Sequence, residues 1–148
     1  MSPLIRAMLC TYLALGGTGT PSLWAQAKYV VLRSGAVDGI ISHEGTWAPQ
    51  KSDITELEAS ITQVSKLQIE GFISALHIEY PGSYFRQYVP VVLEGRKLFY
   101  VSAFCGGPPP KYWHRRLYVV SDGGTCFWQA FYDPALKKYF HLTINPRG

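Results

Sequence analysis

The chain has few charged side chains, few cysteines and none of the short motifs that mark common enzyme classes. Asp, Glu, Lys and Arg make up 16% of its 148 residues, against roughly one quarter in an average soluble protein. The sequence has no Gly-x-Ser-x-Gly elbow, no glycine-rich phosphate loop and no Cys-x-x-Cys pair. These absences weaken the case for a hydrolase, a nucleotide-binding protein or a redox protein. The short length excludes a large multidomain enzyme. We therefore name no catalytic residue and no cofactor, and we favour a non-catalytic protein.

Apolar and aromatic side chains are abundant instead. Hydrophobic residues make up 47% of the chain, and its aromatic residues are 10 Tyr, 7 Phe and 4 Trp, enough to bury the core of one domain without a structural metal. The net charge of +4 is too small an excess to imply nucleic acid. No apolar run is long enough to span a bilayer. We expect neither a nucleic-acid partner nor a transmembrane segment.

The N-terminal residues have the organisation of a signal peptide. Arg6 precedes the apolar stretch 7–15, which has the length of a signal-peptide core and is too short to cross a membrane. Ala25 and Ala27 supply the small-x-small pattern that a signal peptidase accepts. We predict that residues 1–27 are cleaved. A buried N-terminal helix is the alternative, but it would need an amphipathic pattern and a cap.

Cleavage would leave residues 28–148 as a single exported domain, periplasmic or secreted. It would remove Cys10 and leave Cys105 and Cys126 in an oxidising compartment, where two cysteines are normally interpreted as a disulfide. Two separate buried thiols are the alternative.

One amphipathic helix is expected in the first half of this domain. Ser52 and Asp53 are N-cap residues, and Glu56 is placed as a capping-box partner of Asp53. The helix is predicted to end near Gly71. Apolar residues recur there at spacings of three and four, which gives one buried stripe: Ile54, Leu57, Ile61, Val64 and Leu67.

Strands are predicted for the remainder of the domain, over residues 29–33, 84–93, 96–104, 116–120, 126–132 and 137–144. A two-residue hairpin at Glu94-Gly95 would place Val91 opposite Leu98. One apolar face of that hairpin carries Phe85, Val89, Val91, Leu98, Tyr100 and Phe104, and the last hairpin groups Phe127, Phe131, Phe140 and Leu142 on one face. The expected fold is α+β, with one N-terminal amphipathic helix packed on a curved antiparallel meander sheet.

This meander argues against the disulfide. Cys105 would end one strand and Cys126 would begin the next but one, at opposite ends of strand 116–120. A strand of that length spans roughly 20 Å, whereas a disulfide needs Cα atoms within about 7 Å. An oxidising compartment therefore favours a bond between Cys105 and Cys126, whereas the predicted topology disfavours it, and the sequence leaves both alternatives open.

Several segments look familiar. They are Tyr84–Tyr88, Glu94–Arg96, Tyr100–Phe104, Ser121–Gly124, Phe127-Trp128 and Tyr132–Pro134. Over residues 84–145 they resemble a set of small exported bacterial proteins with no assigned activity. The resemblance implies an exported single domain and no particular function.

The order of helix and meander resembles the cystatin-like roll, a shape shared with the nuclear-transport-factor-like roll. Gln87–Val91 resembles the cystatin hairpin motif, and Pro110–Trp113 resembles its later Pro-Trp loop. This resemblance implies a protein inhibitor that presents its hairpin loops to a partner.

Metal ligands occur only in pairs. His43-Glu44 and His77-x-Glu79 each offer two ligands, but the sequence names no third. We therefore predict no metal site.

One basic and aromatic cluster remains as a candidate binding site. The proline-rich connection after residue 107 carries Tyr112, Trp113, His114, Arg115 and Arg116, and Arg86 lies on a neighbouring strand. Rings that stack beside guanidinium groups suit an anionic partner, such as an envelope polysaccharide, a lipid head group or an acidic protein. A solvated edge with aromatic packing below it is the alternative.

The sequence thus favours a non-catalytic binding or interaction module of the cell envelope. A small envelope enzyme with its site in the concavity between helix and sheet is a second hypothesis, which rests on fold analogy. A protein inhibitor that presents hairpin loops is the third.

Overall fold

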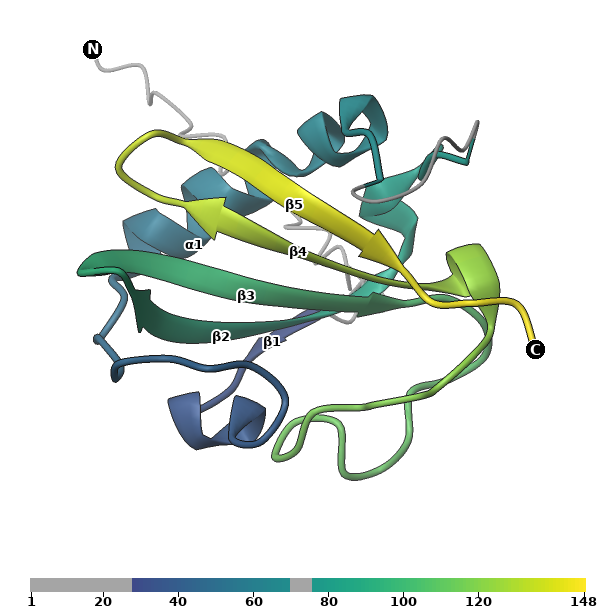
Figure 1. Cartoon of the computed structure of the whole chain (residues 1–148), viewed down its shortest axis with the longest axis horizontal. Helices are drawn as coiled ribbons and strands as arrows, with labels where there is room; N and C mark the ends of the chain where they lie inside the picture. Colours follow the sequence, from purple (N-terminus) through teal and green to yellow (C-terminus); the bar gives the residue numbers. More distant parts are fainter. Residues whose placement is uncertain (1–27, 70–75) are drawn as a thin grey trace, which may run out of the picture.

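The protein has a mixed α+β fold built on one five-stranded, mostly antiparallel sheet (Figure 1). The computed structural model describes residues 28–69 and 76–148, so the predicted signal peptide lies outside the described residues. The strands are β1 (Tyr29–Val31), β2 (Phe85–Leu93), β3 (Arg96–Phe104), β4 (Phe127–Asp133) and β5 (Lys138–Ile144), in that order across the sheet. The helices are α1 (Lys51–Ala59) and the short 3₁₀ segments η1 (Ser34–Val37), η2 (Ile61–Lys66), η3 (Pro81–Ser83) and η4 (Gly124–Cys126). None of the helices in the described ranges is long and apolar enough to cross a membrane.

The β2–β3 hairpin is confirmed in its predicted register. Val91 pairs with Leu98. Its two-residue turn has φ 50° at Glu94 and φ 70° at Gly95, the left-handed conformations that match the twist of the strands. The Glu44 carboxylate accepts hydrogen bonds from the backbone N–H groups of Glu94 (2.8 Å) and Gly95 (3.0 Å). Glu44, a candidate metal ligand in the sequence, therefore caps this turn.

The predicted strand over residues 116–120 does not form, so the predicted antiparallel meander is wrong in this detail. Strand β3 pairs directly with β4, and residues 105–123 form a connection with no strand. The sheet has five strands because β1 also joins it, paired in parallel with β2 at one edge. Three consecutive prolines at 108–110 block a β ladder where the connection begins.

Helix α1 begins earlier in the chain than both predicted N-cap residues, Ser52 and Asp53. Gln50 is the N-cap, and its backbone N–H donates to the Asp53 carboxylate at 2.7 Å. Asp53 therefore lies inside the first turn as the reciprocal partner of a capping box, where its charge also favours the helix dipole. Ser52 is likewise inside the helix, and Glu56 pairs with Lys137 at 3.2 Å instead of closing the box.

The apolar stripe of the predicted helix is buried, although the helix itself is shorter. The α-helical part ends at Ala59, and η2 follows it after Ser60. Leu57, Ile61 and Val64 join the core on one face of the sheet, where their neighbours include Tyr88, Phe99, Val101, Trp128, Ala130, Tyr132 and Tyr139.

The opposite face of the sheet is also covered, so the domain has two cores. The side chains of Val89, Val91, Leu98 and Tyr100, which the sequence placed under the helix, instead pack with Leu32 and Val37 around η1. Figure 1 shows α1 on one side of the sheet, with η1 and the 105–123 connection on the other.

Leu142 departs from the face predicted for the last hairpin. The pairing of β4 with β5 shifts between Gln129 and Phe131, and His141 on the facing strand has φ 54°. An extra residue of this kind is a β-bulge, and it reverses the alternation of side chains beyond it. Leu142 is therefore buried in the core under α1, whereas Phe140 packs toward the η1 side.

Candidate functional site

The loop predicted to contact a partner, residues 110–116, is anchored to the sheet by Trp113. Trp113 is 7% exposed, and its ring packs edge-on against Phe85 (5.7 Å between centroids) and Phe104 (6.2 Å) on the η1 side of the sheet. A ring buried in this way cannot meet a partner. Trp113 therefore anchors the loop, while its neighbours Tyr112 and His114 stay exposed.

A buried glutamine holds the same loop to the sheet. Gln87 is completely buried. Its side-chain N–H₂ donates to the carbonyl oxygens of Trp113 (2.6 Å) and Arg116 (2.8 Å), and its carbonyl oxygen accepts from the Tyr118 N–H (2.7 Å). The contacts to Arg116 and Tyr118 occupy backbone groups that a strand over 116–120 would have used for pairing, which explains why the loop is ordered without a ladder.

We predict that Gln87→Leu destabilises the protein by about 2 kcal/mol, because one buried and two part-buried hydrogen bonds to the backbone are lost. Chemical denaturation followed by circular dichroism measures this effect. Gln68→Leu, an exposed position on the described chain, is the control and should change stability by less than about 0.5 kcal/mol. Equal stability of the two variants would contradict the anchoring role of Gln87.

A disulfide closes the loop at its base. Cys105 and Cys126 are bonded, with their Cα atoms 4.9 Å apart, and the Cys105 N–H donates to the Cys126 carbonyl at 2.9 Å. The topological argument against this bond was wrong because it assumed a strand between β3 and β4. These two strands are direct neighbours, so their adjacent ends bring the cysteines together.

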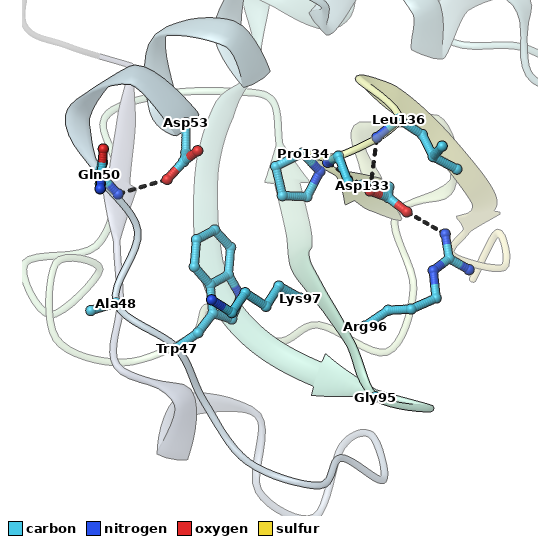
Figure 2. A pocket seen from close by; sticks show the side chains of 11 residues that line it. Trp47, Ala48, Gln50, Asp53, Gly95, Arg96, Lys97, Asp133, Pro134 and Leu136 are labelled. Carbon is cyan, nitrogen blue, oxygen red and sulfur yellow. Dashed lines mark hydrogen bonds and ion pairs between the residues drawn. The ribbon is translucent and has the colours of Figure 1, made fainter.

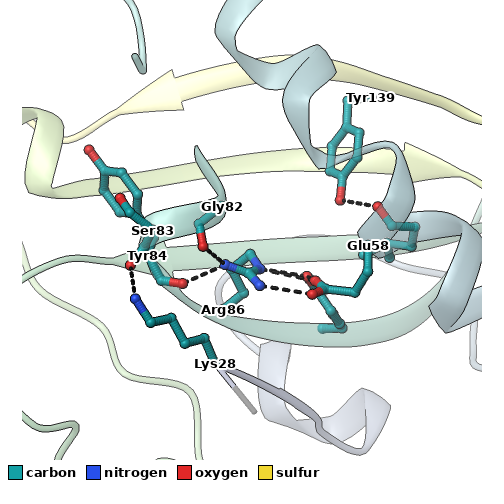
Figure 3. A network of polar contacts seen from close by, with 9 residues as sticks. Lys28, Glu58, Gly82, Ser83, Tyr84, Arg86 and Tyr139 are labelled. Atoms are coloured by element: carbon teal, nitrogen blue, oxygen red, sulfur yellow. Dashed lines mark hydrogen bonds and ion pairs between the residues drawn. The ribbon is translucent and has the colours of Figure 1, made fainter. Parts of the chain in front are cut away.

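Arg86 does not belong to the basic cluster. It lies on β2 next to Gln87, so its side chain points to the other face of the sheet, under α1. There it is 4% exposed and donates to Glu58 through Nε (3.0 Å) and Nη2 (2.8 Å). Figure 3 shows the guanidinium enclosed by Glu58 and the Gly82 and Tyr84 carbonyls. Arg86 therefore forms a buried structural ion pair with Glu58, and its guanidinium cannot reach a partner at the surface.

Three of the four remaining members of the cluster line a cleft of about 660 Å³, and Tyr112 does not. His114, Arg115 and Arg116 form one wall from the loop, and Arg33 contributes from the opposite wall after β1. The other lining residues are Val31, Leu32, Gly35 and Ala36. All four polar residues are exposed.

Arg33 was not predicted as a site residue. It follows the first strand directly, and only the parallel pairing of β1 with β2 carries it to the loop that Gln87 holds on the same edge of the sheet. Parallel pairing of two distant segments has no local signal in a single sequence.

The charge of this cleft is of one sign. It has three arginines and no acidic residue in its lining, and none of the ion pairs found across residues 28–69 and 76–148 involves Arg33, Arg115 or Arg116. The guanidinium of Arg116 lies 5.5 Å from the centre of the Tyr112 ring, and this stacking limits its motion. Guanidinium groups without carboxylate partners beside an apolar wall form a favourable site for an anion.

Comparison with known proteins adds no assignment. No family model matches the chain, and neither a curated protein nor a solved structure matches it. The resemblances to small exported bacterial proteins and to the cystatin-like roll therefore remain predictions.

Proposed function

We propose that this protein is a non-catalytic binding module that holds an anionic group of a cell-envelope component in the cleft between β1–η1 and the 110–116 loop. The observation that carries the proposal is the lining of that cleft. Arg33, Arg115 and Arg116 converge there from two separated segments of the chain with no acidic side chain among them.

The chemistry of the cleft favours a phosphate or a carboxylate. A guanidinium presents parallel N–H groups that match two oxygens of such an anion, which gives both strength and orientation. Leu32 and Ala36 provide an apolar surface beside these groups, and an apolar wall strengthens the electrostatic attraction.

Export of the protein is part of the proposal. The signal peptide over residues 1–27 is a prediction from the sequence alone. The Cys105–Cys126 bond supports it, because structural disulfides persist in oxidising compartments and are rare in the cytosol.

The packing of the domain gives the two alternative functions less support. The space between α1–η2 and the sheet, where an enzyme site was the second hypothesis, is occupied by core side chains such as Leu57, Val64 and Trp128. The residues that resemble cystatin motifs are Gln87 and Trp113, and both are buried. The cystatin-like roll itself remains a proposal, supported by the packing of α1 on one face of the sheet.

Removing the two loop arginines tests this function. We expect the double variant Arg115→Ala, Arg116→Ala to bind anionic probes at least about tenfold more weakly at low salt, because two charge-assisted contacts are lost. The probes are phosphatidylglycerol vesicles, polygalacturonate and inorganic phosphate, each measured by isothermal titration calorimetry. They separate a lipid phosphate, a polysaccharide carboxylate and a free anion as sources of the same chemistry.

The control removes the same charge from outside the cleft. Lys66→Ala, Lys138→Ala takes two exposed positive charges from residues that neither line the cleft nor belong to the 110–116 loop, so it should retain most of the affinity. Raising the salt concentration should weaken binding of the unaltered protein. Equal binding by both double variants would refute the assignment, and so would tighter binding of duplex DNA than of every anionic probe.

A further inference from the structure

A second cleft, of about 840 Å³, lies where the turns of two hairpins meet the start of α1 (Figure 2). Its residues come from three separated parts of the chain, which are the first turn of α1 with the segment before it, the β2–β3 turn with the start of β3, and the end of β4 with the β4–β5 turn. They are Trp47, Ala48, Gln50, Asp53, Gly95, Arg96, Lys97, Asp133, Pro134, Ala135 and Leu136.

An aromatic ring stands in this cleft in a fixed orientation. The indole N–H of Trp47 donates to the Leu98 carbonyl at 3.0 Å, and the ring contacts Phe99 edge-on, with 4.9 Å between centroids. Figure 2 shows the Trp47 ring among the lining residues, with the Lys97 side chain beside its lower end and with Asp53 and Pro134 above it in this view. A ring held by the protein before any ligand arrives loses little entropy on binding.

The charges around the ring are balanced, unlike those of the first cleft. Arg96 and Lys97 are positive, whereas Asp53 and Asp133 are negative. Arg96 donates to Asp133, whose other oxygen accepts the N–H groups of Ala135 and Leu136. Burial disfavours the charged form of Asp133, but the Arg96 guanidinium and these N–H groups outweigh burial and hold its pKa below the ordinary value.

We propose that this second cleft binds a neutral sugar ring, stacked on Trp47 and hydrogen-bonded by the charged groups at its edge. The C–H face of a pyranose is apolar and weakly positive, which suits the negative face of an indole. Its hydroxyl groups both donate and accept hydrogen bonds. Arg96 and Lys97 supply donors and Asp53 supplies an acceptor, so the cleft can satisfy both roles.

Charge decides the class of ligand. Arg96 and the buried Asp133 neutralise each other, so Lys97 and Asp53 are the charges that a ligand would meet. An anionic ligand would be attracted by Lys97 but repelled by Asp53, and a cationic ligand would be attracted by Asp53 but repelled by Lys97. Lys97, whose ammonium lies 5.9 Å from the centre of the Trp47 ring, already occupies the position from which a ligand cation would interact with that ring. A neutral polar ring is repelled by neither charge, and it can contact both the indole ring and the polar groups around it. This inference does not depend on the anion site.

Titration with neutral trisaccharides tests the inference. Triacetylchitotriose and maltotriose are the probes, and two-dimensional NMR of the full chain is the readout, with the indole N–H signal of Trp47 assigned by its loss in Trp47→Phe. We expect one of the probes to shift that signal at millimolar concentration, with little dependence on salt. Trp47→Ala should weaken binding at least about tenfold, and Trp47→Phe, with a smaller ring, should bind at an intermediate level.

Two further variants keep the test decisive. Lys97→Met alters an exposed side chain without opening the core and should weaken binding several-fold even if Trp47→Ala fails to fold. Tyr80→Ala removes an aromatic side chain that is 68% exposed and does not line the cleft, so it should bind as the unaltered protein does. The inference is overturned if neither trisaccharide binds, if Trp47→Ala and Lys97→Met bind normally, or if trigalacturonate binds more tightly than both neutral probes.

Discussion

Replacing Glu58 by alanine is expected to lower the free energy of unfolding by about 3 kcal/mol, because it leaves the buried guanidinium of Arg86 without its counter-charge. The Arg86 side chain is 5% exposed and that of Glu58 is 26% exposed, so water replaces the lost carboxylate poorly. Tyr88 also donates to Glu58, and it would lose an acceptor at the same time. Thermal and chemical denaturation of Glu58→Ala measure the effect.

Helix α1 provides a matched control for this prediction. Glu56 lies two residues earlier and also forms an ion pair, with Lys137, but the two side chains are 44% and 62% exposed. Exposed pairs contribute little, so Glu56→Ala should cost less than about 1 kcal/mol. If the two alanine variants lose equal stability, the buried network is not the source of stability that its geometry indicates.

The same network shows what a single sequence conceals. Arg86 was grouped with the candidate binding residues because it lies on a strand near the basic loop, but its side chain is buried. Its burial depends on Glu58, which is 28 residues away in sequence, and on the carbonyls of the preceding turn. No local sequence pattern pairs residues at that separation. The strand that carries Arg86 was predicted correctly, but the burial of its side chain depends on tertiary contacts that a single sequence does not show.

Local signals succeeded where neighbouring residues decide the structure. Glu94-Gly95 fixed the register of β2–β3, because a two-residue turn leaves only one pairing for the flanking strands. The stripe from Ile54 to Leu67 identified the residues that pack on the sheet, although not which face they cover. The alternating positions of β2 are buried on both sides, and a strand covered on both faces gives no pattern that tells its faces apart.

The sequence identified the candidate site only in part, because some of its residues meet through contacts between distant parts of the chain. Arg115 and Arg116 were selected because they are neighbours in a charged segment. Trp113 was selected with them, yet its ring is the anchor of the loop. Arg33 was missed because it joins the site through a parallel strand pairing. The composition of a loop therefore indicated where the site lies, and long-range packing determined which side chains form it.

Replacing both Cys105 and Cys126 by serine is expected to cost about 3 kcal/mol, because the disulfide closes a loop with a sequence separation of 21 residues and so restricts the unfolded chain. Reductant should lower the stability of the unaltered protein by a similar amount and leave the double variant unchanged. A thiol titration in denaturant, on protein carrying Cys10→Ser, should find no free thiol before reduction. Two free thiols would contradict the bond.

This variant also separates the stability of the domain from the order of its binding loop. His114, Arg115 and Arg116 lie between the two cysteines, but Gln87 and Trp113 hold that loop independently of the disulfide. We therefore expect the serine variant, at temperatures where it stays folded, to bind phosphatidylglycerol vesicles only a few-fold more weakly. Complete loss of binding in a folded serine variant would show that the disulfide, and not the buried glutamine, sets the position of the arginines.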